Sequence, residues 1–151
     1  MKSWSVFIEI GRWTAAALVA VPLTAMTALA DPPVPAASAG ALKLELNRAE
    51  TTPAGCRLSF LAVNSTGKAL QAPAYELVFF SPDGIIEQLT VFDFGAMPEG
   101  KTVVRQFDVP GLGCGAGRIL LNGPVGCEAE DAAHCGAALE LASRTALSFD
   151  K

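Results

Sequence analysis

Apolar and polar residues alternate with a period of two through most of the chain from residue 42 onward. Leu42, Leu44 and Leu46 alternate with charged or amide side chains, a pattern typical of a half-buried strand. Similar runs, bounded by turn-forming residues, cover residues 56–63, 75–80, 85–92, 101–109 and 118–121. Each of these runs predicts a β-strand.

The last apolar segment, residues 139–149, fits two periods. A helix would place Ala142 on the same face as Leu139, whereas a strand would place Leu141 and Leu147 there. We favour a strand, because the six strands before it need a further partner to complete their sheets.

Turn signals separate the predicted strands. Pro82-Asp83-Gly84 suits a type I turn with a left-handed exit and predicts a hairpin between residues 75–80 and 85–92. Seven short strands at such spacings predict an all-β fold, a small antiparallel immunoglobulin-like β-sandwich over residues 42–151. No tryptophan or cysteine lies in the middle of a predicted strand, which excludes an antibody-type domain.

The predicted hairpin carries apolar side chains on both faces. With a four-residue turn, one face holds a set suited to the core: Tyr75, Leu77, Phe79 and Ile86. The other face holds a set that forms a candidate partner surface if it stays exposed: Val78, Phe80, Ile85 and Leu89. Coverage by neighbouring strands would instead make the second set part of the core, and a β-bulge at Gly84 would exchange the two sets.

The N-terminal segment has the organisation of a secretory signal peptide. Lys2 and Arg12 precede a run of eighteen uncharged residues that ends in the small-x-small pattern of Ala28 and Ala30. Residues 1–30 therefore predict a Sec-type signal that exports the protein to a bacterial periplasm. The alternative is an uncleaved membrane anchor, because eighteen uncharged residues reach the lower limit of a spanning helix.

Residues 31–41 are rich in proline and alanine and predict a linker. Without residues 1–30 the chain has 121 residues, enough for one domain. Its nine basic and fourteen acidic side chains give a net charge of −5, against −4 for the whole chain. A negative surface repels phosphate backbones, so we expect no nucleic acid among the partners.

Four cysteines, an even number, lie beyond the predicted signal and predict two disulfides in an oxidising compartment. In an up-and-down strand order, the starts of the second and sixth strands lie at one end of the sandwich. Cys56 opens the second strand and Cys114 precedes the sixth, which favours Cys56–Cys114 and leaves Cys127–Cys135 as a local clip. The other two connectivities stay open at this point.

One glycine-rich stretch matches a cofactor-binding pattern. Gly111-Leu-Gly-Cys-Gly-Ala116 has the G-x-G-x-x-A spacing of dinucleotide-binding loops. Such a loop needs a helix after it, so that free backbone N–H groups meet the pyrophosphate. A predicted strand follows here, and the stretch predicts a turn and no cofactor.

The only histidine, His134, raises two chemical hypotheses. With Cys114 it would form a thiol and base, but a free thiolate would have to escape disulfide pairing. With Glu128, Glu130 and Asp131 it would form a site for a hard cation, but a solvated loop is the simpler interpretation. The sequence therefore predicts neither an enzyme nor a metal site.

Several motifs resemble those of known bacterial proteins. Cys56-x-Leu-x-Phe before Asn64, Phe80-Ser-Pro-Asp-Gly-Ile85 and Met97-Pro-Glu-Gly100 resemble FxLYD-type immunoglobulin-like domains of exported proteins. Over residues 42–150, the cysteine spacing and Val91-Phe-Asp-Phe-Gly95 are similar to uncharacterised alphaproteobacterial exported proteins, often labelled by a twin-arginine signal. Arg12 is a single arginine, so the signal departs from that pattern. The resemblance implies the fold and no activity.

Together these patterns predict an exported, non-catalytic periplasmic binding or protein-interaction module whose partner is unknown. The alternative is an envelope structural or accessory protein, tethered to the membrane by an uncleaved residue 1–30 segment.

Overall fold

The computed structural model describes residues 40–115, 117–127, 135 and 138–151. The predicted signal peptide, including Ala28 and Ala30, lies outside these residues, as do nearly all of the linker and the group formed by Glu128, Glu130, Asp131 and His134.

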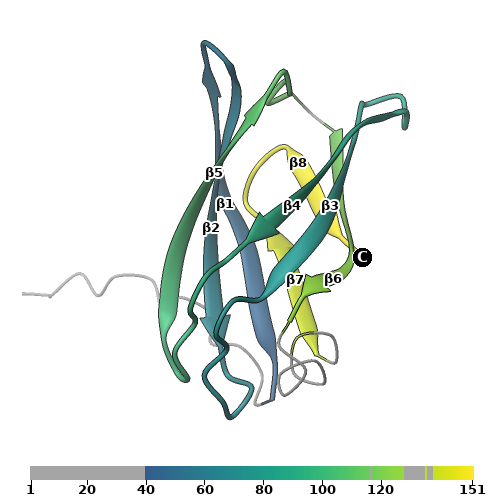
Figure 1. The fold of residues 1–151 in the computed structure, drawn as a ribbon. Helices are drawn as coiled ribbons and strands as arrows, with labels where there is room; N and C mark the ends of the chain where they lie inside the picture. The colour runs from purple at the N-terminus through teal and green to yellow at the C-terminus, as the bar shows by residue number, and fades with distance from the viewer. Residues whose placement is uncertain (1–39, 116, 128–134, 136–137) are drawn as a thin grey trace, which may run out of the picture. The chain divides into compact units, whose positions relative to one another are not determined.

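Eight strands form two four-stranded sheets that face each other (Figure 1). The strands are β1 (Leu42–Thr52), β2 (Gly55–Asn64), β3 (Ala74–Phe80), β4 (Ile86–Asp93), β5 (Thr102–Pro110), β6 (Gly117–Gly126), β7 (Leu139–Ser143) and β8 (Leu147–Asp150). One sheet has the order β5-β2-β1-β7 and the other the order β4-β3-β6-β8. The predicted all-β sandwich is confirmed. Two of its pairings, β1 with β7 and β6 with β8, are parallel.

The C-terminal segment forms two strands, one in each sheet. The chain leaves β7 through a short turn, in which the hydroxyl of Ser143 donates to the carbonyl of Leu147 at 2.6 Å. Leu147 and Phe149 are buried, and Leu139 and Leu141 pack against the same core. The predicted strand face is therefore correct, but the strand passes from one sheet to the other between residues 143 and 147.

A cluster of aromatic rings fills the space between the sheets. Phe60 of β2 lies at its centre, with four edge-to-face neighbours at centroid distances of 5.5 to 6.0 Å: Phe92, Phe94, Phe107 and Phe149. Phe92 of β4 stacks on Phe107 of β5 at 4.0 Å, which joins the edge strands of the two sheets. These pairs add specific geometry to the hydrophobic burial that stabilises the sandwich.

The β3–β4 hairpin contains a bulge that changes one predicted assignment. Tyr75, Leu77 and Phe79 are buried as expected. The register shifts after Phe79, which faces Gln88, so that Phe80 faces Ile86. The extra residue on β4 moves Ile86 out of the core row, and its side chain is 56% exposed. The prediction that Ile86 belongs to the core is wrong.

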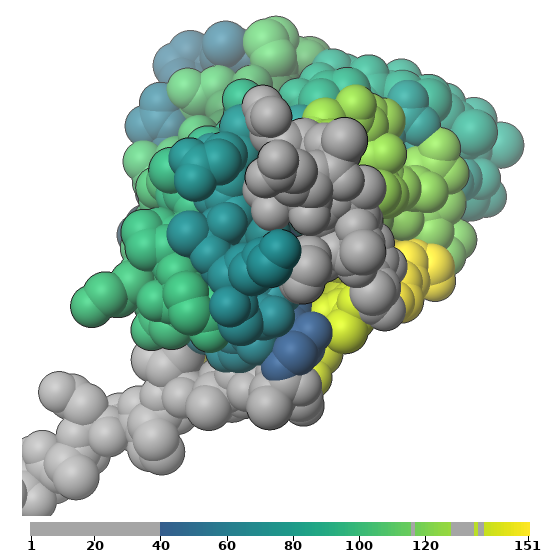
Figure 2. Space-filling model, turned by 60° about the horizontal axis from the view of Figure 1, so that its bottom comes forward, coloured from purple at the N-terminus to yellow at the C-terminus, as the bar shows by residue number. Residues whose placement is uncertain are grey.

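Asn64, which is fully buried, organises one end of the domain. Its amide donates to the carbonyls of Lys68 and Met97, at 2.7 and 2.9 Å, and its side-chain oxygen accepts from Thr66. Leu70 and Met97 also pair through their backbones. Figure 2 brings this end of the domain forward and shows the two connections, residues 64–73 and 94–101, next to each other. The turn residues that carry the resemblance thus have a structural role.

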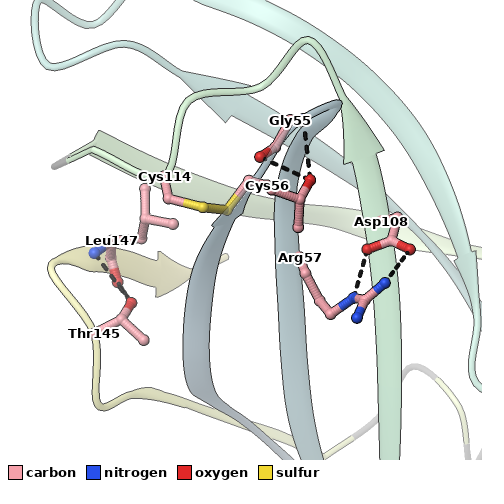
Figure 3. The surroundings of a disulfide bond; sticks show 8 residues. Gly55, Cys56, Arg57, Asp108, Cys114, Thr145 and Leu147 are labelled. Atoms are coloured by element: carbon pink, nitrogen blue, oxygen red, sulfur yellow. Dashed lines mark hydrogen bonds and ion pairs between the residues drawn. A yellow bond between two sulfur atoms is a disulfide. The ribbon is translucent and has the colours of Figure 1, made fainter.

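The cysteines form the two pairs that the strand order favours, Cys56–Cys114 and Cys127–Cys135, with Cα–Cα distances of 5.2 and 6.5 Å. Figure 3 shows the first disulfide linking the start of β2 to the loop before β6. Next to Cys56, Arg57 donates to both carboxylate oxygens of Asp108 on β5, at 2.7 and 2.9 Å. The start of β2 is thereby fixed to two neighbouring segments.

Candidate interaction surface

The outer face of the sheet β4-β3-β6-β8 carries an apolar row, which we call the outer strip and define as Val78, Leu89, Val91 and Leu120. Val78 of β3 faces Leu89 of β4 on one side and Leu120 of β6 on the other. Paired residues of neighbouring strands point to the same face of a sheet. Val78 is 5% exposed but does not belong to the core cluster, which contains its neighbours Leu77 and Phe79. The strip therefore lies on the side away from the core.

The exposed part of the outer strip lies on an edge strand. Within the described sheets, β4 pairs only with β3, so its other side presents backbone N–H and C=O groups without a strand partner. Four large apolar side chains on β4 or just before it are more than half exposed: Ile85 (67%), Ile86 (56%), Leu89 (54%) and Val91 (53%). An unpaired edge with exposed apolar side chains is a surface suited to contact with another chain.

The opposite sheet ends in β5, whose edge is protected. The guanidinium of Arg105 extends from β5 and donates to the carbonyls of Phe94 and Ala96, at 2.6 and 3.0 Å. Arg57 and Asp108 form an ion pair on the same sheet. Hydrogen bonding by Arg57 is the main cause that lowers the pKa of Asp108 below its ordinary value. Charged side chains on an edge strand discourage association with another strand. The charged side chains of β4 are Glu87 and Asp93, both acidic.

The charge around the outer strip has one sign. Leu89, Val91 and Asp93 follow the period of two along β4. Glu87, two residues before Leu89, is the extra residue of the bulge and is exposed. No lysine or arginine occurs anywhere in residues 69–100. Glu76, which faces Val91, accepts a hydrogen bond from the amide of Asn122 at 2.5 Å. The strip is therefore bordered by acidic groups on its own hairpin.

A hollow of about 490 Å³ lies at the end of the same sheet and is lined by Phe80, Ser81, Pro82, Gly84, Gly117, Arg118 and Ala146. The Arg118 guanidinium lies over the Phe80 ring, 5.6 Å from its centroid. Its Nε atom donates to Asp150 at 2.9 Å, and this hydrogen bonding raises the pKa of Arg118 above its ordinary value. The charge that faces the hollow is thus already neutralised by an acid of the same sheet.

The structure divides the predicted partner surface between these two places. Val78 and Leu89 belong to the outer strip, Ile85 is exposed at its end, and Phe80 is half-buried in the wall of the hollow. Val91 was missed, although the period of two from Leu89 indicates it. Leu120 and Arg118 were also missed, because only the pairing of β3 with β6 brings them to this surface.

The glycine-rich loop has a structural explanation. Gly111 has a φ of +76° just after β5, which is the left-handed conformation that favours glycine. Gly117 lies so close to β3 that an added Cβ would be 2.5 Å from the carbonyl oxygen of Phe80. The strand β6 follows this loop, where a dinucleotide site needs a helix N-terminus.

Further observations concern the other candidate residues and the described part of the chain. Cys114 is held in a disulfide, so its sulfur is no nucleophile in this state. Within the described ranges, no three histidine, cysteine or acidic side chains are placed to share a metal ion. The same ranges contain no helix that is long and apolar enough to span a membrane.

Comparisons of the chain with protein-family models, curated proteins and solved structures gave no match.

Proposed function

We propose that the protein is a non-catalytic binding module, exported to the periplasm, that contacts another protein through the outer strip and the edge of β4. The observation that carries this proposal is the position of Leu89 and Val91, which are more than half exposed on a strand with one unpaired side. Exposed apolar groups at an open sheet edge cost solubility unless a partner covers them. An interaction role accounts for their presence.

The two disulfides suggest an oxidising location outside the cytoplasm. The signal-like pattern of residues 1–30 supports the periplasm in particular. Mass spectrometry of the exported protein tests this, with Asp31 expected as the first residue. Retention of residues 1–30 would favour the alternative, an envelope accessory protein tethered by its N-terminus.

Affinity capture from an envelope fraction tests the binding role. The exported protein and its Val91→Thr and Leu89→Ser variants serve as baits, and thermal unfolding of each bait checks that the fold is intact. We expect both variants to recover at least severalfold less of any specific partner, because Val91 and Leu89 face solvent and contribute to contact and little to folding.

Val104→Thr is the matched control. Val104 is 57% exposed on the edge strand β5 of the opposite sheet, so the same chemical change is made at a similar exposure on a different surface. Equal loss in Val91→Thr and Val104→Thr would contradict a site on β4. The variant Phe80→Ser tests the wall of the hollow instead of the outer strip. A large drop in its melting temperature would show that Phe80 belongs to the core.

A further inference from the structure

The chemistry of β4 indicates what kind of chain it accepts. Along the chain, the exposed apolar residues Leu89 and Val91 stand between two acids, Asp93 after them and Glu87 in the bulge before them. The backbone on the open side of this strand needs N–H and C=O partners, which an added strand supplies. Side chains of the added strand would lie opposite those of β4 on the same face.

We propose that β4 binds an extended segment of a partner protein that alternates apolar residues and carries a lysine or arginine at each end, and that this segment extends the sheet β4-β3-β6-β8 by one strand. This inference rests on the proposed binding role and names the chemistry of the partner. One acid stands two residues before Leu89 and the other two residues after Val91, so a segment with a basic residue at each end brings a base to each acid in either direction.

Charge favours a basic segment over a second copy of this chain at the edge of β4. Two β4 strands paired side by side would bring together Glu87 and Asp93 from both copies, and residues 69–100 offer no basic side chain to compensate. Like charges opposite each other destabilise a strand pair. A basic segment replaces this repulsion by attraction.

The arginines of β5 and β6 have other partners, although Arg118 lines a hollow together with Glu87. Asp93 accepts a hydrogen bond from the backbone N–H of Gly95 at 2.7 Å. Arg118 of β6 is paired with Asp150 of β8. Arg105 of β5 donates to backbone carbonyls of residues 94, 96 and 104. Among the residues that the structure describes, neither arginine forms an ion pair with Glu87 or Asp93.

The test uses three capped peptides and the protein purified after export. The first is Lys-Thr-Val-Thr-Val-Thr-Lys, the second has glutamate in place of both lysines, and the third has proline in place of the central threonine. Each peptide is titrated at low salt, and each is also fused after Lys151 through a flexible Gly/Ser linker of about 20 residues, which supplies a high effective concentration. Amide hydrogen exchange and NMR shifts report on β4.

We expect the lysine peptide to protect backbone amides of β4 and to bind about ten-fold more tightly than the glutamate peptide, with the difference shrinking as salt is added. Proline should abolish the protection, because it removes a backbone donor and disfavours a ladder. The variant Glu87→Lys with Asp93→Lys should reverse the preference between the two charged peptides.

Equal affinity for both charged peptides, protection outside β4, or no protection even when the lysine peptide is fused to the protein would overturn the proposal. Concentration-dependent dimerisation through β4, seen by sedimentation, would assign the edge to a second copy instead. These results differ from failure of the binding role itself, which appears as envelope capture that is unaffected by Val91→Thr and Leu89→Ser. If envelope capture depends on Leu89 and Val91 but the protein shows no preference for basic peptides, the binding role stands and only the proposed basic partner segment is wrong.

Discussion

The hydroxyl of Tyr75 donates a hydrogen bond to the backbone carbonyl of Cys135 at 3.0 Å, and both residues are fully buried. Tyr75 is a core residue near the start of β3, and Cys135 belongs to the second disulfide. The contact joins the sheet to the segment that this disulfide closes. The acceptor is a backbone oxygen, so this hydrogen bond does not depend on the side chain of residue 135.

Replacing Tyr75 by phenylalanine should lower the free energy of unfolding by about 1–3 kcal/mol, because the ring still packs but a buried carbonyl loses its donor. Urea unfolding of the two proteins measures the difference. Mass mapping under non-reducing conditions should show the same disulfides in both. An unchanged unfolding free energy would mean that water replaces the hydroxyl.

Tyr75 should also make stability sensitive to alkali. Burial raises the pKa of its phenol well above the ordinary value of about 10. The folded state holds the proton more tightly than the unfolded state, so this contribution is complete below the ordinary pKa and is lost as the pH rises through the folded-state pKa. Tyr75 is the only tyrosine in the chain, so phenolate absorbance reports on it alone. We expect ionisation to coincide with unfolding, and Tyr75→Phe to weaken the alkaline loss of stability.

The two disulfides should differ in their effect on stability. Cys56–Cys114 spans 58 residues and Cys127–Cys135 spans 8. In the chain-entropy model, these loops correspond to about 4 and about 2–3 kcal/mol. We therefore expect the double change to serine at Cys56 and Cys114 to lower the urea midpoint more than that at Cys127 and Cys135. The reverse order would show that local contacts, such as that of Tyr75, outweigh loop closure.

Gly117 should tolerate no larger residue. An added Cβ would lie 2.5 Å from the carbonyl oxygen of Phe80, so Gly117→Ala must push β6 from β3 and should cost about 1–3 kcal/mol. Gly113→Ala, in the loop just before β6, is the matched control, since its Cβ would meet nothing within 4 Å. Thermal unfolding compares them, and equal melting temperatures would contradict the close approach of the strands.

The sequence correctly predicted the strands and turns that are determined by the pattern of a few neighbouring residues. The alternation at Leu42, Leu44 and Leu46 predicted a strand from residue 42, and all three side chains are buried in β1. The turn at Pro82-Asp83-Gly84 predicted the hairpin, in which Gly84 has a φ of +79°. Such signals act within a few residues and need no knowledge of neighbouring strands.

Features that depend on distant pairing were not predictable in the same way. The bulge that exposes Ile86 lies where β3 also pairs with β6, whereas the sequence raised a bulge only at Gly84 and only as an alternative. Arg118 and Leu120 reach the candidate surface only through that pairing. β7 and β8 pair in parallel with the strands that still have an open edge, β1 and β6. The residue pattern of one strand does not indicate which edges are open.

The passage of residues 139–150 from one sheet to the other also has a consequence for when the molecule can fold. β7 completes the sheet that begins with β1, and β8 completes the other sheet and brings Phe149 against Phe60. A chain that still lacks residues 139–150 has neither closing strand, so one side of β1 and one side of β6 stay without a strand partner. Because Phe149 is one of the four ring neighbours of Phe60, the aromatic cluster is complete only once β8 is in place.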